Sequence, residues 1–89
     1  MTLFQIFYTP EAKERLEEIA QFDPKSARII VDHIKSLPQT YRTDPFLSGP
    51  HYQGLRRNRA GKYRAIYRVL EKEGEIRVIT IDLRKSVYD

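Results

Sequence analysis

The sequence predicts an α+β fold in which a two-helix hairpin packs on a small antiparallel sheet, with the element order β-α-α-β-β-β. Two observations support this prediction. The first half of the chain contains two apolar stripes at helical spacing, each preceded by a capping signal. The second half contains three runs of strand-forming residues separated by glycine-containing links. A length of 89 residues fits one domain, residues 1–89, with one small core.

The first strand is expected over residues 3–8, where apolar and aromatic residues predominate. It ends at Thr9-Pro10, which predicts a helix start, because threonine caps helices and proline favours the first helical position. The first helix is predicted to run through about Gln21. Its apolar stripe consists of Ala12, Leu16, Ile19 and Ala20. The acidic residues of its other face are interpreted as a solvated surface.

A second helix is expected directly after the first, because Asp23-Pro24 repeats the start signal. Its apolar stripe consists of Ala27, Ile30, Val31 and Ile34. A residue that precedes proline is disfavoured in a helix, so this helix is predicted to end before Leu37-Pro38. The short connection makes the two helices antiparallel, and both stripes need an apolar surface, which a sheet provides.

Residues 38–51 are rich in proline and glycine, which predicts an ordered loop that returns Phe46 and Leu47 to the core. Three strands then follow, at about residues 52–59, 62–70 and 75–84. Their short links predict an antiparallel meander. Apolar side chains occupy both alternating sets of the last strand, which predicts a central strand that is covered on both faces.

The composition excludes several classes of protein. Without cysteine the chain has neither a disulfide framework nor thiolate chemistry, which suits a reducing cytoplasm. His33 and His51 are isolated and are interpreted as ordinary polar or half-buried histidines, so no metal site and no cofactor are expected. The apolar runs are far shorter than the roughly 18 residues that span a bilayer. No export signal is visible, so we expect a cytoplasmic location without a membrane partner.

Basic charge is concentrated in the second half of the chain. Residues 1–50 carry 6 Lys and Arg against 7 Asp and Glu, whereas residues 51–89 carry 10 against 5. The net charge of +5 in the second half favours a polyanion, or an acidic protein that competes for the same surface. Arginines at alternate positions of a strand converge on one face and bind phosphate with two N–H groups each, so Arg57 and Arg59 predict a phosphate-binding surface. Solvated strand faces are the alternative interpretation.

Nearly the whole chain resembles the RelE/ParE superfamily of toxins from type II toxin–antitoxin pairs. The resemblance rests on the Thr9-Pro10 helix start, the loop through Leu47 and Gly49, the segment GKYRAIY at residues 61–67, and RKSVY at residues 84–88. It implies a RelE-like toxin domain and a cognate antitoxin. The antitoxin is expected to be similar to RelB, partly acidic and helical. The pair is expected to contact DNA only through the antitoxin. The terminal segment is similar to the arginine and tyrosine that RelE-type mRNA interferases place at the scissile phosphate.

That similarity implies a metal-independent endoribonuclease, which cleaves mRNA in the ribosomal A site by attack of the substrate's own 2′-hydroxyl and so inhibits translation. Members of the ParE type share the fold but inhibit DNA gyrase. A gyrase-inhibiting toxin is therefore the alternative, and a catalytically inactive antitoxin-binding module is a third interpretation.

The expected site combines residues for catalysis with residues for RNA binding. The catalytic set consists of Arg59, Arg64, Arg84 and Tyr88. The RNA-binding set consists of Arg57, Arg59, Lys62 and Lys85. Arginine, with a pKa above about 12, stabilises the charged phosphorane but is a poor general base. Tyr88 beside Arg84 and Arg64 is therefore the main candidate for proton transfer, with the two lysines in reserve. Side chains expected in the core are Tyr63 and Tyr67, and arginines expected at the periphery are Arg56, Arg68 and Arg77.

Overall fold

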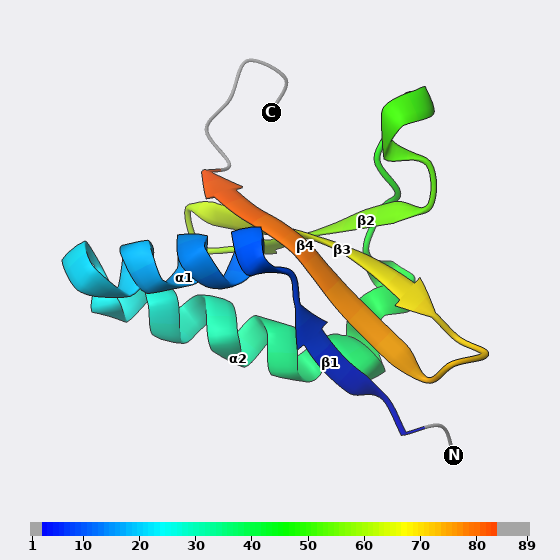
Figure 1. Cartoon of the computed structure of the whole chain (residues 1–89), viewed down its shortest axis with the longest axis horizontal. Coiled ribbons are helices and arrows are strands. Elements are labelled where there is room, and N and C mark those ends of the chain that lie inside the picture. Colours follow the sequence, from blue (N-terminus) through cyan, green and yellow to red (C-terminus); the bar gives the residue numbers. More distant parts are fainter. Residues whose placement is uncertain (1–2, 84–89) are drawn as a thin grey trace.

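The computed structural model describes residues 3–83, which form two α-helices and four β-strands in the predicted order (Figure 1). The first half consists of β1 (Gln5–Tyr8), α1 (Pro10–Phe22) and α2 (Pro24–Thr40). The second half consists of β2 (Leu55–Ala60), β3 (Tyr63–Leu70) and β4 (Glu75–Leu83). Two short 3-10 turns, η1 (Tyr41–Thr43) and η2 (Pro50–Tyr52), lie in the connection between α2 and β2. Within residues 3–83, neither helix has the length and apolarity needed to cross a membrane.

Both predicted capping signals start their helices. The Thr9 hydroxyl accepts a hydrogen bond from the Ala12 amide at 3.1 Å and donates one to the Ile79 carbonyl at 2.6 Å, so it also ties α1 to β4. The Asp23 carboxylate accepts from the Ser26 amide at 3.2 Å and from the Ser26 hydroxyl at 2.7 Å at the start of α2. The hydrogen bond from the Ser26 hydroxyl makes the largest contribution and that from the Ser26 amide the next. Together they hold the pKa of the Asp23 carboxyl below its ordinary value.

The predicted end of the second helix before Leu37-Pro38 is wrong, because α2 continues through Pro38 to Thr40. Leu37 and Tyr41 are 0% and 2% exposed, and the Tyr41 amide donates to the Leu37 carbonyl. Burial of such side chains contributes about 1.5–3 kcal/mol each. Together they offset the roughly 3 kcal/mol cost of a proline inside a helix. Tertiary packing therefore outweighs the local preference at this position.

The four strands form one sheet in the order β1-β4-β3-β2. Strands β2, β3 and β4 pair antiparallel, which confirms the predicted meander, and β4 lies inside the sheet as its alternation predicted. Strand β1 pairs with β4 in parallel, so the sheet is mixed and not antiparallel throughout as predicted. A register shift after Ile66 places Thr80 opposite Ile66 and Val78 opposite Tyr67.

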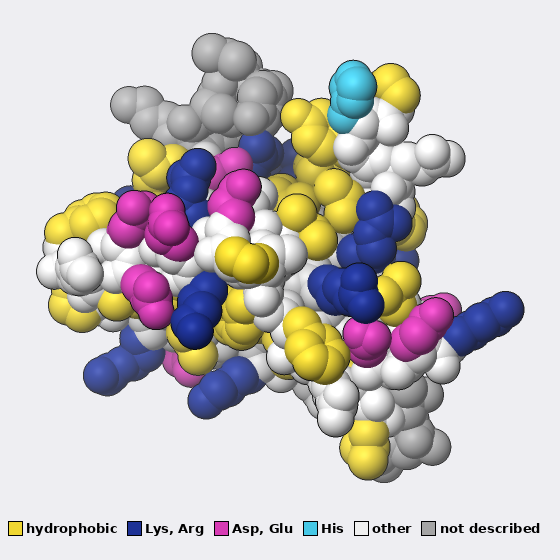
Figure 2. Space-filling view, viewed as in Figure 1, with side chains coloured by type: hydrophobic (Ala, Val, Ile, Leu, Met, Phe, Trp, Pro, Cys, Tyr) yellow, Lys and Arg dark blue, Asp and Glu magenta, His cyan; other side chains and the backbone are white. Residues whose placement is uncertain are grey.

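The two faces of the sheet differ. Both helices pack on one face, where Tyr63 and Tyr67 are buried in the core as predicted. Other buried strand residues on this face are Ala60, Ala65, Ile76, Val78 and Ile81. The outer surface of α1 carries interspersed acidic and basic side chains (Figure 2), in agreement with a solvated face. The residues that alternate with the core set, among them Arg57, Arg64 and Thr80, point to the face that has no helix.

Candidate functional site

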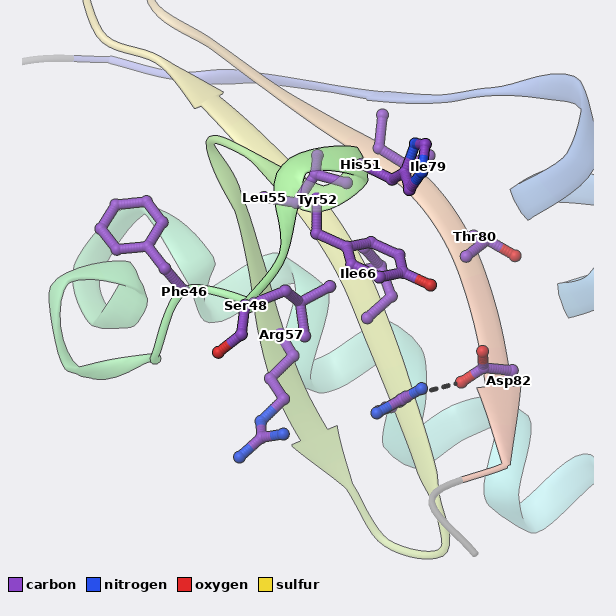
Figure 3. A pocket seen from close by; sticks show the side chains of 12 residues that line it. Phe46, Ser48, His51, Tyr52, Leu55, Arg57, Ile66, Ile79, Thr80 and Asp82 are labelled. Atoms are coloured by element: carbon purple, nitrogen blue, oxygen red, sulfur yellow. Dashed lines mark hydrogen bonds and ion pairs between the residues drawn. The ribbon is translucent and has the colours of Figure 1, made fainter. Parts of the chain in front are cut away.

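The face of the sheet that carries no helix contains a cavity of about 620 Å³ (Figure 3). Its floor is built by strands β2, β3 and β4, and the connection between α2 and β2 forms a wall. Floor residues include Leu55, Arg57, Arg64, Ile66, Thr80 and Asp82. Wall residues include Phe46, Leu47, His51 and Tyr52. A volume of this size accommodates a small organic ligand.

The strand register sets the order of the polar groups on the floor. Arg59 lies opposite Arg64, and Arg64 lies opposite Asp82, so these residues form one row across β2, β3 and β4. The neighbouring row consists of Arg57, Ile66 and Thr80. Directly opposite residues of an antiparallel pair have Cβ atoms about 4.5–5.5 Å apart. The structure therefore brings Arg57, Arg59 and Arg64 together on one face.

Arg64 is 6% exposed and is held in the floor by an ion pair. Its Nε donates to Asp82 Oδ1 at 2.9 Å (Figure 3). This contact fixes the plane of the guanidinium group and places a carboxylate beside it inside the cavity. Asp82 was not among the predicted site residues, because only the register between β3 and β4 shows that it faces Arg64.

Arg57 is half-buried, and its Nε is fully enclosed without a hydrogen-bond partner among residues 3–83. A buried N–H group that lacks an acceptor costs about 1–3 kcal/mol. Arg57 also lines the cavity, so the exposed part of its side chain is available to an anion there. Arg57 is thus held in the floor with part of its side chain open to the cavity.

The wall of the cavity is fastened to the edge of β2 by backbone hydrogen bonds. The Leu47 amide donates to the Leu55 carbonyl at 2.8 Å, and the Arg57 amide donates to the Pro45 carbonyl at 3.1 Å. These bonds hold the wall residues in a defined position above the floor. They also cover the edge of β2 that would otherwise be open to strand pairing.

A polar network on the helix-covered face anchors the same connection. The Asp44 carboxylate accepts from the Tyr67 hydroxyl at 2.6 Å and from Asn58 Nδ2 at 2.9 Å. The side-chain oxygen Oδ1 of Asn58 in turn accepts from His33 Nδ1 at 3.0 Å. Burial, and next the bond to Asp44, raise the pKa of Tyr67, so its hydroxyl stays protonated and donates. His33 therefore takes part in this network and does not line the cavity.

A family model described as ParE toxin of type II toxin-antitoxin system, parDE, matches residues 6–88. The chain belongs to the ParE toxin family. Membership of this family confirms the resemblance to the RelE/ParE superfamily. No curated protein matches the chain.

Several solved structures share the fold of this ParE-family toxin. The toxin–antitoxin complex RelBE2 from Mycobacterium tuberculosis gives a TM-score of 0.77 at 20% identity, covering 92% of this chain and 99% of that chain. The YoeB/ParE toxin from Agrobacterium tumefaciens gives a TM-score of 0.78 at 20% identity, covering 91% of this chain and 99% of that chain. The archaeal RelE-RelB complex from Pyrococcus horikoshii OT3 gives a TM-score of 0.71 at 21% identity, covering 98% of this chain and 100% of that chain. The predicted RelE-like fold is thus confirmed.

Other predicted site residues of this ParE-family toxin lie elsewhere. Lys62, in the turn between β2 and β3, pairs through Nζ with Asp23 Oδ2 at 3.3 Å and so faces the connection between the helices. Gly61 in the same turn has a φ of 63°, which suits a two-residue hairpin with glycine at its first position. The predicted residues Arg84, Lys85 and Tyr88 lie outside the described residues. The arginines predicted at the periphery, which do not line the cavity, are Arg56, Arg68 and Arg77.

The structure adds wall residues to this toxin's candidate site and corrects one expectation. Phe46 does not return to the core but is 58% exposed, because its loop runs along the outer edge of β2, where Phe46 pairs with Arg56. Leu47 is half-buried and lines the cavity. His51 and Tyr52 also line it. The sequence gives little indication that His51 and Tyr52 belong to the site, since only the path of the loop places them in the same cavity as the arginines.

Proposed function

We propose that this toxin is a ribosome-dependent endoribonuclease that cleaves mRNA in the A site and thereby inhibits translation. The observation that carries the proposal is the floor of the cavity, where Arg57 and Arg64 line one volume and Arg59 lies beside Arg64. Guanidinium groups remain charged at any physiological pH and grip two phosphate oxygens with parallel N–H donors. RNA presents one phosphate for each nucleotide, so the floor matches its backbone.

The proposed reaction needs no metal ion. The 2′-hydroxyl of the substrate attacks the adjacent phosphorus, the bond to the 5′-oxygen of the next nucleotide breaks, and a 2′,3′-cyclic phosphate and a 5′-hydroxyl result. Negative charge grows on the phosphorane, where Arg57 and Arg64 act as preorganised donors. The toxin must also hold the attacking and leaving oxygens in line, because alignment removes a large part of the barrier.

Proton transfer requires a base for the 2′-hydroxyl and an acid for the leaving oxygen. Tyr88 with Arg84 remains the prediction for this role from the sequence. Within residues 3–83, the cavity adds an imidazole and a carboxylate, those of His51 and Asp82. Asp82, which contacts Arg64, is the nearer of the two to the arginines, whereas His51 lies with Tyr52 at the other end of the cavity (Figure 3). The ammonium group of Lys62 is engaged by Asp23.

We also propose a cognate antitoxin as the partner, acidic in part, helical and similar to RelB. The RelBE2 and archaeal RelE-RelB structures are complexes of this kind. The net charge of +5 over residues 51–89 favours acidic segments of such a partner. Exposed apolar side chains, Phe22 and Ile29 among them, offer apolar contact area on the helices. Contact with DNA is then made only through the antitoxin.

A second candidate function is inhibition of DNA gyrase, and the matching ParE family model favours it. A gyrase inhibitor acts by binding, so it makes no use of aligned donors around a phosphate. A third candidate, an inactive antitoxin-binding module, predicts no toxicity.

The test compares the wild type with Arg57→Ala and with the control Arg77→Ala, which removes the same charge from an exposed position outside the cavity. Each is expressed in growing cells, transcript ends are mapped with and without ongoing translation, and a DNA-damage reporter is followed. The ribonuclease predicts new transcript ends only during translation for wild type and Arg77→Ala, and their loss in Arg57→Ala. Growth arrest with DNA damage and no new transcript ends establishes the gyrase inhibitor instead.

A further inference from the structure

The two ends of the cavity differ in chemistry. Figure 3 shows Tyr52 and His51 at one end, whereas Arg57 and the Arg64–Asp82 pair lie at the other. Tyr52 is 49% exposed, although its ring lines a cavity with an apolar floor. A large aromatic side chain left half-exposed beside apolar residues is typical of a binding surface.

The floor between the two ends is apolar. Leu55 and Ile66 are buried there, on neighbouring strands. Leu55 and Arg57 are two positions apart on β2, which corresponds to about 7 Å along a strand. The distance from a flat apolar group on Leu55 and Ile66 to the Arg57 guanidinium would therefore be similar to the distance between the base and the phosphate of one nucleotide. A nucleotide has this arrangement, since its base and its phosphate lie on opposite sides of the ribose.

The position of Tyr52 is fixed by its turn. Its amide donates to the Gly49 carbonyl at 3.2 Å, and Pro50 begins the short η2 helix. Gly49 has a φ of 101°, a conformation that residues with a side chain rarely adopt. The backbone hydrogen bond between Leu47 and Leu55 holds the neighbouring part of the loop. Binding at the Tyr52 ring therefore costs the loop little conformational entropy.

We infer that Tyr52, with His51 beside it, is the base-binding wall of the cavity and takes one base of single-stranded RNA, whose phosphate contacts Arg57. The inference rests on the proposed ribonuclease function and adds to it the part of the site that holds the base. Every base has a flat face, so stacking on Tyr52 raises affinity without selecting a sequence.

Two probes separate contact with the base from contact with phosphate. One is a short fluorescent 2′-O-methyl oligouridine, whose methyl group blocks cleavage. The other is an abasic oligomer with the same number of phosphates. Binding to the purified full chain is measured by fluorescence anisotropy, and circular dichroism verifies that each variant is folded. Phe22→Ala serves as the matched control, because Phe22 is an exposed aromatic residue far along the chain from the cavity.

Tyr52→Ala is expected to weaken binding of the oligouridine about tenfold and to leave the abasic oligomer unchanged. Tyr52→Phe should bind both probes like the wild type, and Tyr52→Leu should behave like Tyr52→Ala, because it lacks a flat ring. Arg57→Ala should weaken both probes.

The inference is overturned if Tyr52→Ala affects both probes equally or neither, or if Tyr52→Leu binds like the wild type. In those cases RNA binding by the wild type still supports the ribonuclease. If the wild type binds neither probe, the inference is overturned, whereas the proposed function is decided separately by the mapping of transcript ends during translation.

Discussion

Arg56 and Arg57 are neighbours on β2, yet they lie on opposite faces of the sheet and meet opposite surroundings. On the helix-covered face, the Arg56 guanidinium donates to the Asp44 carbonyl at 2.9 Å and lies 3.9 Å from the centre of the Phe46 ring. On the other face, the Arg57 Nε is enclosed without a partner among residues 3–83. The same type of side chain is thus engaged in packing and hydrogen bonding at one position and lines the cavity at the next.

The comparison extends to the two faces as a whole. The helix-covered face satisfies its polar groups internally, as the bonds of Asp44 to Tyr67 and Asn58 show. The cavity face gathers like charges, with Arg59 opposite Arg64, and the Asp82 carboxylate opposite Arg64 offsets part of their repulsion. What distinguishes the cavity arginines of this toxin is therefore the face of the sheet that they occupy and not the abundance of arginine in the sequence.

The largest effect on stability is expected on the helix-covered face. Tyr67→Ala removes a fully buried ring and the donor to Asp44, so it should lower the free energy of unfolding by about 3–5 kcal/mol. Tyr52→Ala, on the cavity wall, should change it by no more than about 0.5 kcal/mol. Urea unfolding followed by circular dichroism measures both. Equal losses for the two variants would contradict the contrast between the faces.

The two neighbouring arginines should separate activity from stability. Arg57→Ala is expected to slow RNA cleavage by about 10²–10³-fold, because it removes a donor to the phosphorane. Arg56→Ala should leave the rate nearly unchanged but lower the free energy of unfolding by about 1–3 kcal/mol, through its lost charged hydrogen bond and ring contact. Single-turnover cleavage on programmed ribosomes and urea unfolding are the measurements. An active Arg57→Ala would remove Arg57 from the site.

Asp82 tests whether the carboxylate in the cavity positions Arg64. Asp82→Asn keeps a hydrogen-bond acceptor at the same place but removes a charge that repels phosphate, so RNA binding should tighten a few-fold. The cleavage rate at saturation should fall by about tenfold, because Arg64 is held less firmly. Opposite changes in binding and rate are not expected from a merely structural residue. If Asp82→Asn slows cleavage and weakens binding together, the positioning role is wrong.

The elements of the fold follow from local chemistry, and the sequence predicted them for that reason. The capping residues Thr9 and Asp23 act within one helical turn of their partners, so they could be recognised without knowledge of the fold. Pro38 shows the limit of this approach. Its local preference is for a helix end, but burial of Leu37 and Tyr41 against the sheet continues α2 beyond it.

The candidate site was predictable where it depends on alternation along a single strand. That rule was enough to put Arg57 and Arg59 on one face. Asp82 and Tyr52 were missed because their positions depend on the register between β3 and β4 and on the path of the connection before β2. Both are set by contacts between distant parts of the chain, which no local pattern encodes.

The smallest effect is expected at the start of α2, outside the cavity. The folded pKa of Asp23 is lowered, so the carboxylate stabilises the fold above its ordinary pKa, and this contribution is lost as the pH falls through the lowered folded value. Asp23→Asn keeps a good capping residue but no longer titrates. The urea midpoint of the variant should therefore fall less steeply between pH 5 and pH 3 than that of the wild type, while the two remain similar at neutral pH. Parallel curves over this range would show that the hydrogen bonds from Ser26 do not favour the charged form of Asp23 in solution.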